Sequence, residues 1–224
     1  SEGGLVAKVE SGEEISCEKL LVSIGRAPNT KNLNLDAVGV KTERGAVLVD
    51  ANFASSVPGI YAIGDSNAKQ MLAHAAMAQG AFAADKIMGH PAFYNANCIP
   101  SCIYTRPQVA GVGLTEKAAK EQGIDYKVGL FPLAANGKAL IEGSENGLVK
   151  ILTNEYEQII GAHIIGSGAV EMIGEMSLAI NMEVLMEDVV ATIHAHPTVS
   201  EAWAEAVLAV SGRAIHWPPG LPVR

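Results

Sequence analysis

The order of secondary-structure signals after residue 98 constrains the fold more than any other feature of this sequence. Four segments rich in β-branched and other apolar residues are joined by short polar turns, and segments with apolar residues at helical spacing follow them. The predicted strands cover 109–114, 126–132, 147–152 and 158–165, and the predicted helices cover 115–122, 169–182, 186–192 and 198–210. Strands followed by helices are typical of an antiparallel sheet packed against helices, an α+β arrangement within the broad α/β class.

The first 94 residues carry a different pattern, in which short strand signals alternate with one long helix. The predicted strands cover 5–10, 19–24, 47–49 and 60–63, and the predicted helix covers 71–88. This alternation is typical of the end of one α/β layer and the start of another. We therefore place a domain boundary near Tyr94.

Composition and charge exclude several kinds of partner. The net charge is −8, the pI is 5.2 and there is no run of Lys or Arg, so we expect neither nucleic acid nor a membrane surface as a partner. No apolar stretch reaches the roughly 18 residues of a membrane span. The three cysteines do not make a disulfide scaffold and indicate a reducing compartment, which is the cytoplasm or an organelle matrix in a eukaryote.

The strongest local signal for chemistry is the segment HAHPTVSE, residues 194–201. An imidazole can take up and return a proton near neutral pH, and a carboxylate on its other nitrogen fixes its tautomer and orientation. His196, which precedes Pro197 and a helix, and Glu201 are therefore a candidate acid–base pair. The alternative is a capping box in which Glu201 only binds the amide of Thr198, and the local pattern leaves both interpretations open. We interpret His194 as structural.

A second candidate site is the turn that ends the segment GIYAIGD, residues 59–65. Asp65 can accept hydrogen bonds from ligand hydroxyls, and free amides at the following helix start, residues 71–73, can hold a partial negative charge. Taken alone, an ordinary Asp turn explains this pattern better than a ligand site does.

Other patterns imitate functional motifs without meeting their chemical requirements. Gly166-Ser167-Gly168 precedes a helix as a dinucleotide loop does, but Glu171 stands at the third glycine position and would repel a pyrophosphate. Cys98 and Cys102 have no nearby cation to stabilise a thiolate, so we do not expect them to be redox-active. No cluster has the spacing of a zinc site, and no metal is expected.

Several motifs nevertheless stand in a characteristic order along the chain. They are IGRAPNT (24–30), IYAIGD (60–65), MLAHAA (71–76), NCIPSCIYTRPQVAGVG (97–113), FPLAANGKA (131–139), GAHIIG (161–166) and HAHPTVSEA (194–202). Together they resemble the C-terminal half of the flavoprotein disulfide reductases, in particular the branch that oxidises dihydrolipoamide. The resemblance implies the end of a Rossmann-like NAD-binding domain (1–27), the C-terminal part of an FAD-binding domain (28–94) and a dimerisation, or interface, domain (95–224).

The resemblance also implies cofactors and residue roles. FAD and NAD would be the cofactors, and Asp65 would bind the ribityl chain of FAD. Gly25 would lie beside NAD. His196 would deprotonate the substrate dithiol, oriented by Glu201, at the flavin and disulfide of the partner subunit in a homodimer. The full set of implied cofactor-binding residues is Gly25, Arg26, Asp65, Met71, Leu72, Ala73 and His74.

The resemblance also implies a protein that carries the substrate and an apolar surface in the interface domain. A lipoyl-bearing acyltransferase of a 2-oxo acid dehydrogenase complex would present the substrate, and the interface domain would carry an apolar stripe of Met172, Ile173, Met176, Ala179 and Ile180.

The N-terminal FAD fingerprint, the redox disulfide and the NAD glycine loop are absent from this sequence, so we do not expect the chain alone to run the reaction. Two alternatives remain, a glutathione-reductase-like enzyme and a non-catalytic dimerisation module. The tail from His216 to Gly220 differs from the expected short apolar end.

Overall fold

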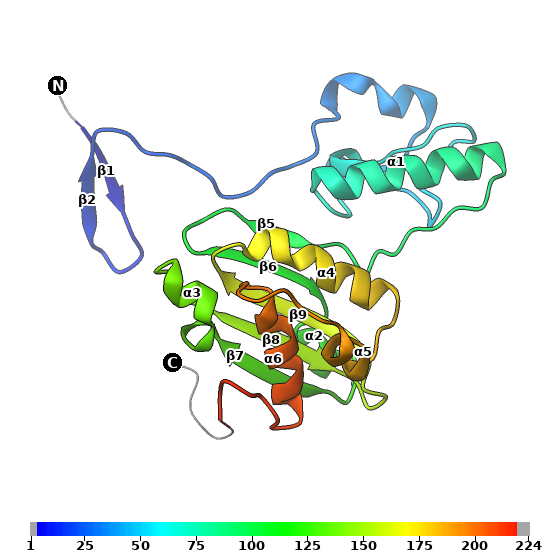
Figure 1. Ribbon diagram of the computed structural model, residues 1–224. Coiled ribbons are helices and arrows are strands. Elements are labelled where there is room, and N and C mark those ends of the chain that lie inside the picture. Colours follow the sequence, from blue (N-terminus) through cyan, green and yellow to red (C-terminus); the bar gives the residue numbers. More distant parts are fainter. Residues whose placement is uncertain (1–3, 219–224) are drawn as a thin grey trace. The chain divides into compact units, whose positions relative to one another are not determined.

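The computed structural model describes residues 4–218, and the chain divides into two compact units, residues 1–94 and 95–224 (Figure 1). Each unit is considered by itself. Within the described residues, no helix is both long and apolar enough to cross a membrane.

The second unit is built on a five-stranded antiparallel sheet. In spatial order its strands are β5 (Ser101–Ile103), β6 (Gln108–Gly113), β9 (Ile159–Gly166), β8 (Leu148–Thr153) and β7 (Lys127–Pro132). The four longer strands lie within a residue of the predicted bounds. The prediction of an antiparallel sheet with helices is therefore confirmed.

Helices cover one face of this sheet and enclose the main core. Figure 1 shows α4 and α6 lying across the sheet, where α4 packs on β6 and β9 and α6 packs on β7 and β8. The helices of this unit are α2 (Glu116–Glu121), α3 (Gly137–Ile141), α4 (Ala169–Asn181), α5 (Met186–Ala191) and α6 (Glu201–Val210), with a short 3-10 turn, η4 (Leu133–Ala135). The largest core side chains, which include Trp203, Phe131 and Leu133, are at most 1% exposed. Burial of this apolar surface is the main stabilising term for the unit.

The predicted apolar stripe on α4 faces the sheet of its own chain. Ile173, Met176 and Ala179 are 2%, 1% and 7% exposed, and Met172 and Ile180 pack against the same core. Leu178 and Met182, which lie on another face of α4 or at its end, are each 64% exposed. The stripe therefore stabilises the unit, and the exposed apolar side chains are different ones.

The opposite face of the sheet carries α2. Lys150 alternates along β8 with the buried Val149 and Ile151, and its ammonium donates a 2.6 Å hydrogen bond to Glu116 of α2. This hydrogen bond is the main cause that lowers the pKa of Glu116. Thr115 caps the helix as predicted, because its hydroxyl accepts a hydrogen bond from the Ala118 amide at 3.1 Å.

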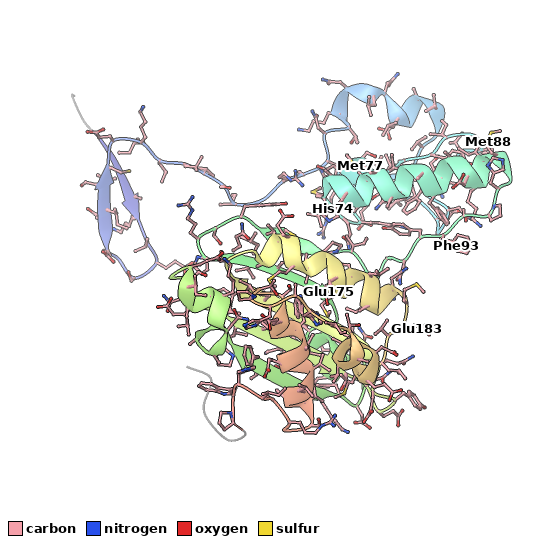
Figure 2. All side chains as sticks on the ribbon, viewed as in Figure 1. His74, Met77, Met88, Phe93, Glu175 and Glu183 are labelled. Carbon is pink, nitrogen blue, oxygen red and sulfur yellow. The ribbon has the colours of Figure 1, made fainter. Side chains whose placement is uncertain are left out.

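The first unit contains two small hairpins and one long helix. Its elements are β1 (Leu5–Lys8), β2 (Glu14–Cys17), η1 (Lys31–Leu33), η2 (Leu35–Val38), β3 (Thr42–Glu43), β4 (Ala46–Val47), η3 (Gly64–Asn67) and α1 (Ala73–Met88). Its core is small: Phe53 packs edge-to-face against Phe82 and Tyr94, with ring centroids 5.8 and 5.2 Å away. Figure 2 labels Met77, Met88 and Phe93, which are 74%, 68% and 92% exposed.

Two predicted strands of the first unit do not form. Residues 19–24 are irregular, with Leu21 89% and Ile24 94% exposed, and residues 60–63 make only an isolated bridge between Tyr61 and Ala54. β-branched residues favour a strand only where a neighbouring strand supplies hydrogen bonds and a packed face. Within residues 4–218 no such neighbour pairs with 19–24, and the strand that pairs with β1 is β2 at Glu14–Cys17 instead.

Candidate active site

The sequence-predicted pair His196 and Glu201 is brought together at the start of α6. Nδ1 of His196 donates to the Glu201 carboxylate, at 3.0 Å from Oε1 and 3.2 Å from Oε2. The imidazole side chain is 78% exposed, whereas that of Glu201 is 29% exposed. Within the described residues Nε2 of His196 has no hydrogen-bond partner. The ring is therefore oriented through one nitrogen and presents the other to solvent, and the His196–Pro197 peptide bond is cis.

Glu201 combines the two roles that the sequence left open. Its Oε2 accepts a 2.8 Å hydrogen bond from the Thr198 amide, as in a capping box. The reciprocal bond is missing, because the Thr198 hydroxyl donates to the Ala195 carbonyl at 2.6 Å, and α6 begins at Glu201 instead of at the predicted residue 198. Helix capping and imidazole orientation thus share one carboxylate.

Burial and hydrogen bonding act in opposite directions on this carboxylate. Burial raises the pKa of Glu201, but the hydrogen bonds from the Thr198 amide and from His196, with the nearby imidazoles of His196 and His216, lower the pKa below its ordinary value of 4.5 overall. Glu201 is consequently ionised at neutral pH and can only accept hydrogen bonds.

One residue that supports this loop was missed by sequence reasoning. Asn136, 5% exposed, caps α3 by accepting a 2.9 Å hydrogen bond from the Ala139 amide, and its amide group donates at 3.1 Å to the Thr198 carbonyl. Asn136 lies inside the motif FPLAANGKA, and an Asn directly before a possible helix start is the signal that could have revealed it. It fixes the backbone between His196 and Glu201 from the side of η4 and α3.

His194 is held differently from His196. Its side chain is 9% exposed, with Nε2 2.8 Å from Oε1 of Glu175 and Nδ1 3.1 Å from the Thr192 carbonyl oxygen. Both ring nitrogens are occupied. This arrangement agrees with a structural interpretation of His194.

The first unit brings three of the implied cofactor residues together. The Arg26 guanidinium lies 3.5 Å from the Asp65 carboxylate and also donates to the Met71 carbonyl. Both charged side chains are more than half exposed, so the ion pair itself contributes little stability. Gly25 has a left-handed φ of 130° and open space around its Cα.

The turn that carries Asp65 is fastened by buried polar residues that sequence reasoning also missed. Gln79 of α1 is 0% exposed, and its Oε1 accepts from the Gly64 amide at 2.8 Å and from Asn67 at 3.0 Å. Gly64 has φ +61°, and a Cβ there would lie 2.7 Å from Cβ of Ala76. A polar residue on the apolar face of a predicted helix was the signal that could have revealed Gln79.

The helix start next to this turn offers backbone donors. α1 begins at Ala73, two residues after the predicted start, with Leu72 as an N-cap that makes no side-chain cap. The side chain of the N-cap residue therefore does not bond to the start of the helix at Ala73, and the positive end of the helix favours an acceptor atom of a ligand.

The cysteines carry no sign of redox chemistry. Cys17, Cys98 and Cys102 are free thiols, and Cys98 donates to the Ser177 carbonyl at 2.9 Å. Burial raises the pKa of both Cys98 and Cys102, with Glu171 adding to the effect at Cys102. Both groups are therefore thiols at neutral pH. Among residues 4–218 no group of three or more His, Cys, Asp or Glu side chains could hold a metal ion.

Comparison with family descriptions gives two matches along the chain. The dimerisation domain of pyridine nucleotide-disulphide oxidoreductases matches residues 99–207, and a second description, pyridine nucleotide-disulphide oxidoreductase, matches residues 1–80.

Individual relatives agree with these matches. The chain is 45% identical over 225 residues to the mitochondrial dihydrolipoyl dehydrogenase of Sus scrofa and 44% identical to that of Homo sapiens, and each alignment covers 97% of this chain. The chain spans 44% of the length of these relatives.

Solved structures show the same fold. LpdA of Mycobacterium tuberculosis has a TM-score of 0.85 and 25% identity, covering 92% of this chain and 45% of that one. The HOCl-induced flavoprotein disulfide reductase RclA of Escherichia coli has a TM-score of 0.84 and 24% identity, covering 92% of this chain and 48% of that one.

Proposed function

The chain belongs to the pyridine nucleotide-disulphide oxidoreductase family, and from this premise we propose that it is the C-terminal part of a dihydrolipoyl dehydrogenase. In the proposed reaction, dihydrolipoamide and NAD⁺ give lipoamide, NADH and a proton. The dithiol loses two electrons and two protons, and the electrons reach NAD⁺ as a hydride. The observation that carries the proposal is the exposed, oriented imidazole of His196.

His196 is the proposed acid–base residue of this reaction. A thiolate, not a thiol, attacks a disulfide sulfur, so a base must first remove a proton from the substrate dithiol. Nε2 of His196 accepts this proton, and Glu201, bound to Nδ1, keeps Nε2 in the accepting tautomer and stabilises the imidazolium. The same ring returns the proton in the reverse direction.

The first unit holds the proposed cofactor residues. The polar groups around η3 and α1 fit a flavin: the Asp65 carboxylate would accept hydrogen bonds from hydroxyl groups of the ribityl chain, and the start of α1 at Ala73 and His74 would lie at the ring, where the positive end of the helix favours acceptor atoms. Met71 and Leu72 complete that set, and Gly25 and Arg26 belong to the NAD side. When bound, FAD supplies the two-electron relay between the dithiol and NAD.

The proposed assembly is a homodimer in which His196 serves the partner subunit. The family match over residues 99–207 is to a dimerisation domain. A lipoyl-bearing acyltransferase of a 2-oxo acid dehydrogenase complex is the proposed substrate carrier. The proposed location is a reducing compartment, the cytoplasm or an organelle matrix.

The decisive test replaces His196→Gln in the full-length enzyme. Glutamine can hydrogen-bond but cannot exchange a proton, so kcat for dihydrolipoamide with NAD⁺ should fall by about 10²-fold or more. NADH oxidation by an artificial electron acceptor, which needs no base at the dithiol, is the control and should persist. Unchanged dihydrolipoamide turnover would refute the assigned base.

Two further measurements separate the alternatives. Wild-type enzyme that reduces glutathione disulfide but does not oxidise dihydrolipoamide would identify a glutathione-reductase-like activity. The purified 224-residue chain distinguishes a dimerisation module: a colourless stable dimer supports that role, whereas visible flavin absorbance with partner-dependent activity supports an enzyme segment.

A further inference from the structure

The two histidines of the segment HAHP have opposite bonding patterns, and we propose that His194 is a positioning residue that fastens the His196 loop to α4 through Glu175. The proposal rests on the acid–base role proposed for His196. It assigns to His194 no contact with the substrate.

The geometry joins an otherwise irregular loop to a well-packed helix. Figure 2 labels Glu175 on α4, and its Oε1 lies 2.8 Å from Nε2 of His194. On the neighbouring turns of the same helix, Ile173 and Met176 are buried in the core, at 2% and 1% exposure. A bond to Glu175 is therefore a bond to a rigid element.

Hydrogen-bond counting assigns the two imidazoles to different tasks. The two ring nitrogens of His194 each have a partner within the chain, the Glu175 carboxylate and the Thr192 carbonyl. Neither nitrogen is therefore available to a substrate while both contacts persist. His196 uses one nitrogen on Glu201 and keeps the other available.

This bond holds the part of the loop that lies between its two anchored ends. Between α5, which ends at Ala191, and α6, which begins at Glu201, the chain forms no helix or strand. The end next to α6 is held by the bonds of Thr198 to Glu201 and to Asn136. The end next to α5 is held by Thr192, whose amide and hydroxyl donate to the Asp188 carbonyl. Between them, within the part of the chain that the structure describes, the Glu175 contact is the one hydrogen bond that joins residues 193–195 to a helix or strand.

Loss of this contact should change the chemical step more than the binding of NAD. Without this bond residues 193–195 can move and displace Nε2 of His196, and displacements of about 1 Å can cost up to about 10²-fold in rate. Neither residue belongs to the apolar cluster of the unit, but the His194 side chain is only 9% exposed, so normalising the rates to bound flavin separates loss of fold from loss of position.

The experiment uses the full-length enzyme, with rates normalised to bound flavin. His194→Ala and Glu175→Ala should each lower kcat for dihydrolipoamide by about 10-fold while the KM for NAD⁺ stays unchanged. Glu175→Gln keeps an acceptor oxygen for Nε2–H of His194 and should restore kcat to within about 2-fold of the wild-type value. The double variant His194→Ala/Glu175→Ala should be no slower than either single variant, because both remove the same interaction.

A matched control and a reference variant make the outcome decisive. His90 also faces a carboxylate, that of Asp85 at 3.6 Å, but its side chain is 62% exposed, and His90→Ala should leave kcat unchanged. Wild-type kcat in His194→Ala, or equal losses in Glu175→Gln and Glu175→Ala, would overturn the positioning role. If His196→Gln also retains full activity, the proposed function has failed instead.

Discussion

Residues 95–218 and residues 4–94 differ in how completely each buries its own apolar side chains. The second unit encloses a continuous core in which Trp203, Leu133 and Ile151 are all 0% exposed. The first unit has two small buried groups, one around Phe53 and one around Val40 and Val47, and it exposes Leu21 at 89% and Phe93 at 92%. The second unit therefore supplies its own hydrophobic stabilisation, whereas the exposed apolar segments of the first unit are suited to packing against further surfaces.

The largest expected effect comes from expressing the two units separately. Residues 95–224 alone should unfold in one cooperative thermal transition, because their sheet, helices and core are complete within the unit. Residues 1–94 alone should show no cooperative transition, because their buried apolar groups are small and their hairpins are short. Scanning calorimetry measures both, and a sharp transition in residues 1–94 would show that their small core is sufficient for a stable fold.

A smaller effect is expected from matched truncations of one apolar side chain in each unit. Trp203→Ala removes a fully buried indole and should lower the free energy of unfolding by about 3–5 kcal/mol. Leu21→Ala removes a side chain that is 89% exposed and should change it by less than about 0.5 kcal/mol in this chain. Denaturant titration gives both values, and comparable losses would show that residues 19–24 are packed in solution.

The smallest expected effect concerns charge in the second unit. The folded-state pKa of Glu201 lies below its ordinary value of 4.5, so the carboxylate stabilises the fold at pH above 4.5 and loses this contribution as pH falls through the lowered pKa. The stability difference between the wild-type chain and Glu201→Gln should therefore be larger at neutral pH than in acid. Thermal melts at several pH values test this, and a difference independent of pH would contradict it.

The sequence predicted the second unit better than the first for a physical reason. The strands after residue 98 pair with one another, so their alternation of apolar residues is realised within the unit. Residues 19–24 carry an equally clear strand pattern, but strand formation needs a partner that pattern alone does not provide. The helix at 71–88 was predicted nearly to its ends, because helical hydrogen bonds are local.

In the candidate site, too, local contacts could be predicted from the sequence and long-range contacts could not. His196 and Glu201 are five residues apart, so their pairing could be anticipated from the segment itself, and the structure confirms the contact but not the catalytic role. The supporting residues Asn136 and Gln79 bond to groups distant in the sequence. The local sequence around Asn136 or Gln79 cannot predict such long-range bonds, because they depend on how distant segments pack.

The close contact of α6 with the sheet has a consequence for comparing this chain with its relatives. A Cβ on Gly129 of β7 would lie 1.9 Å from the carbonyl oxygen of Ala206, one turn beyond Glu201 on the same helix. The short distance between α6 and β7 is therefore possible only because residue 129 has no Cβ. In a relative with a larger side chain at this position, the whole helix would have to lie farther from the sheet. The carboxylate that corresponds to Glu201 would then move with the helix, even if the segment HAHPTVSE were unchanged.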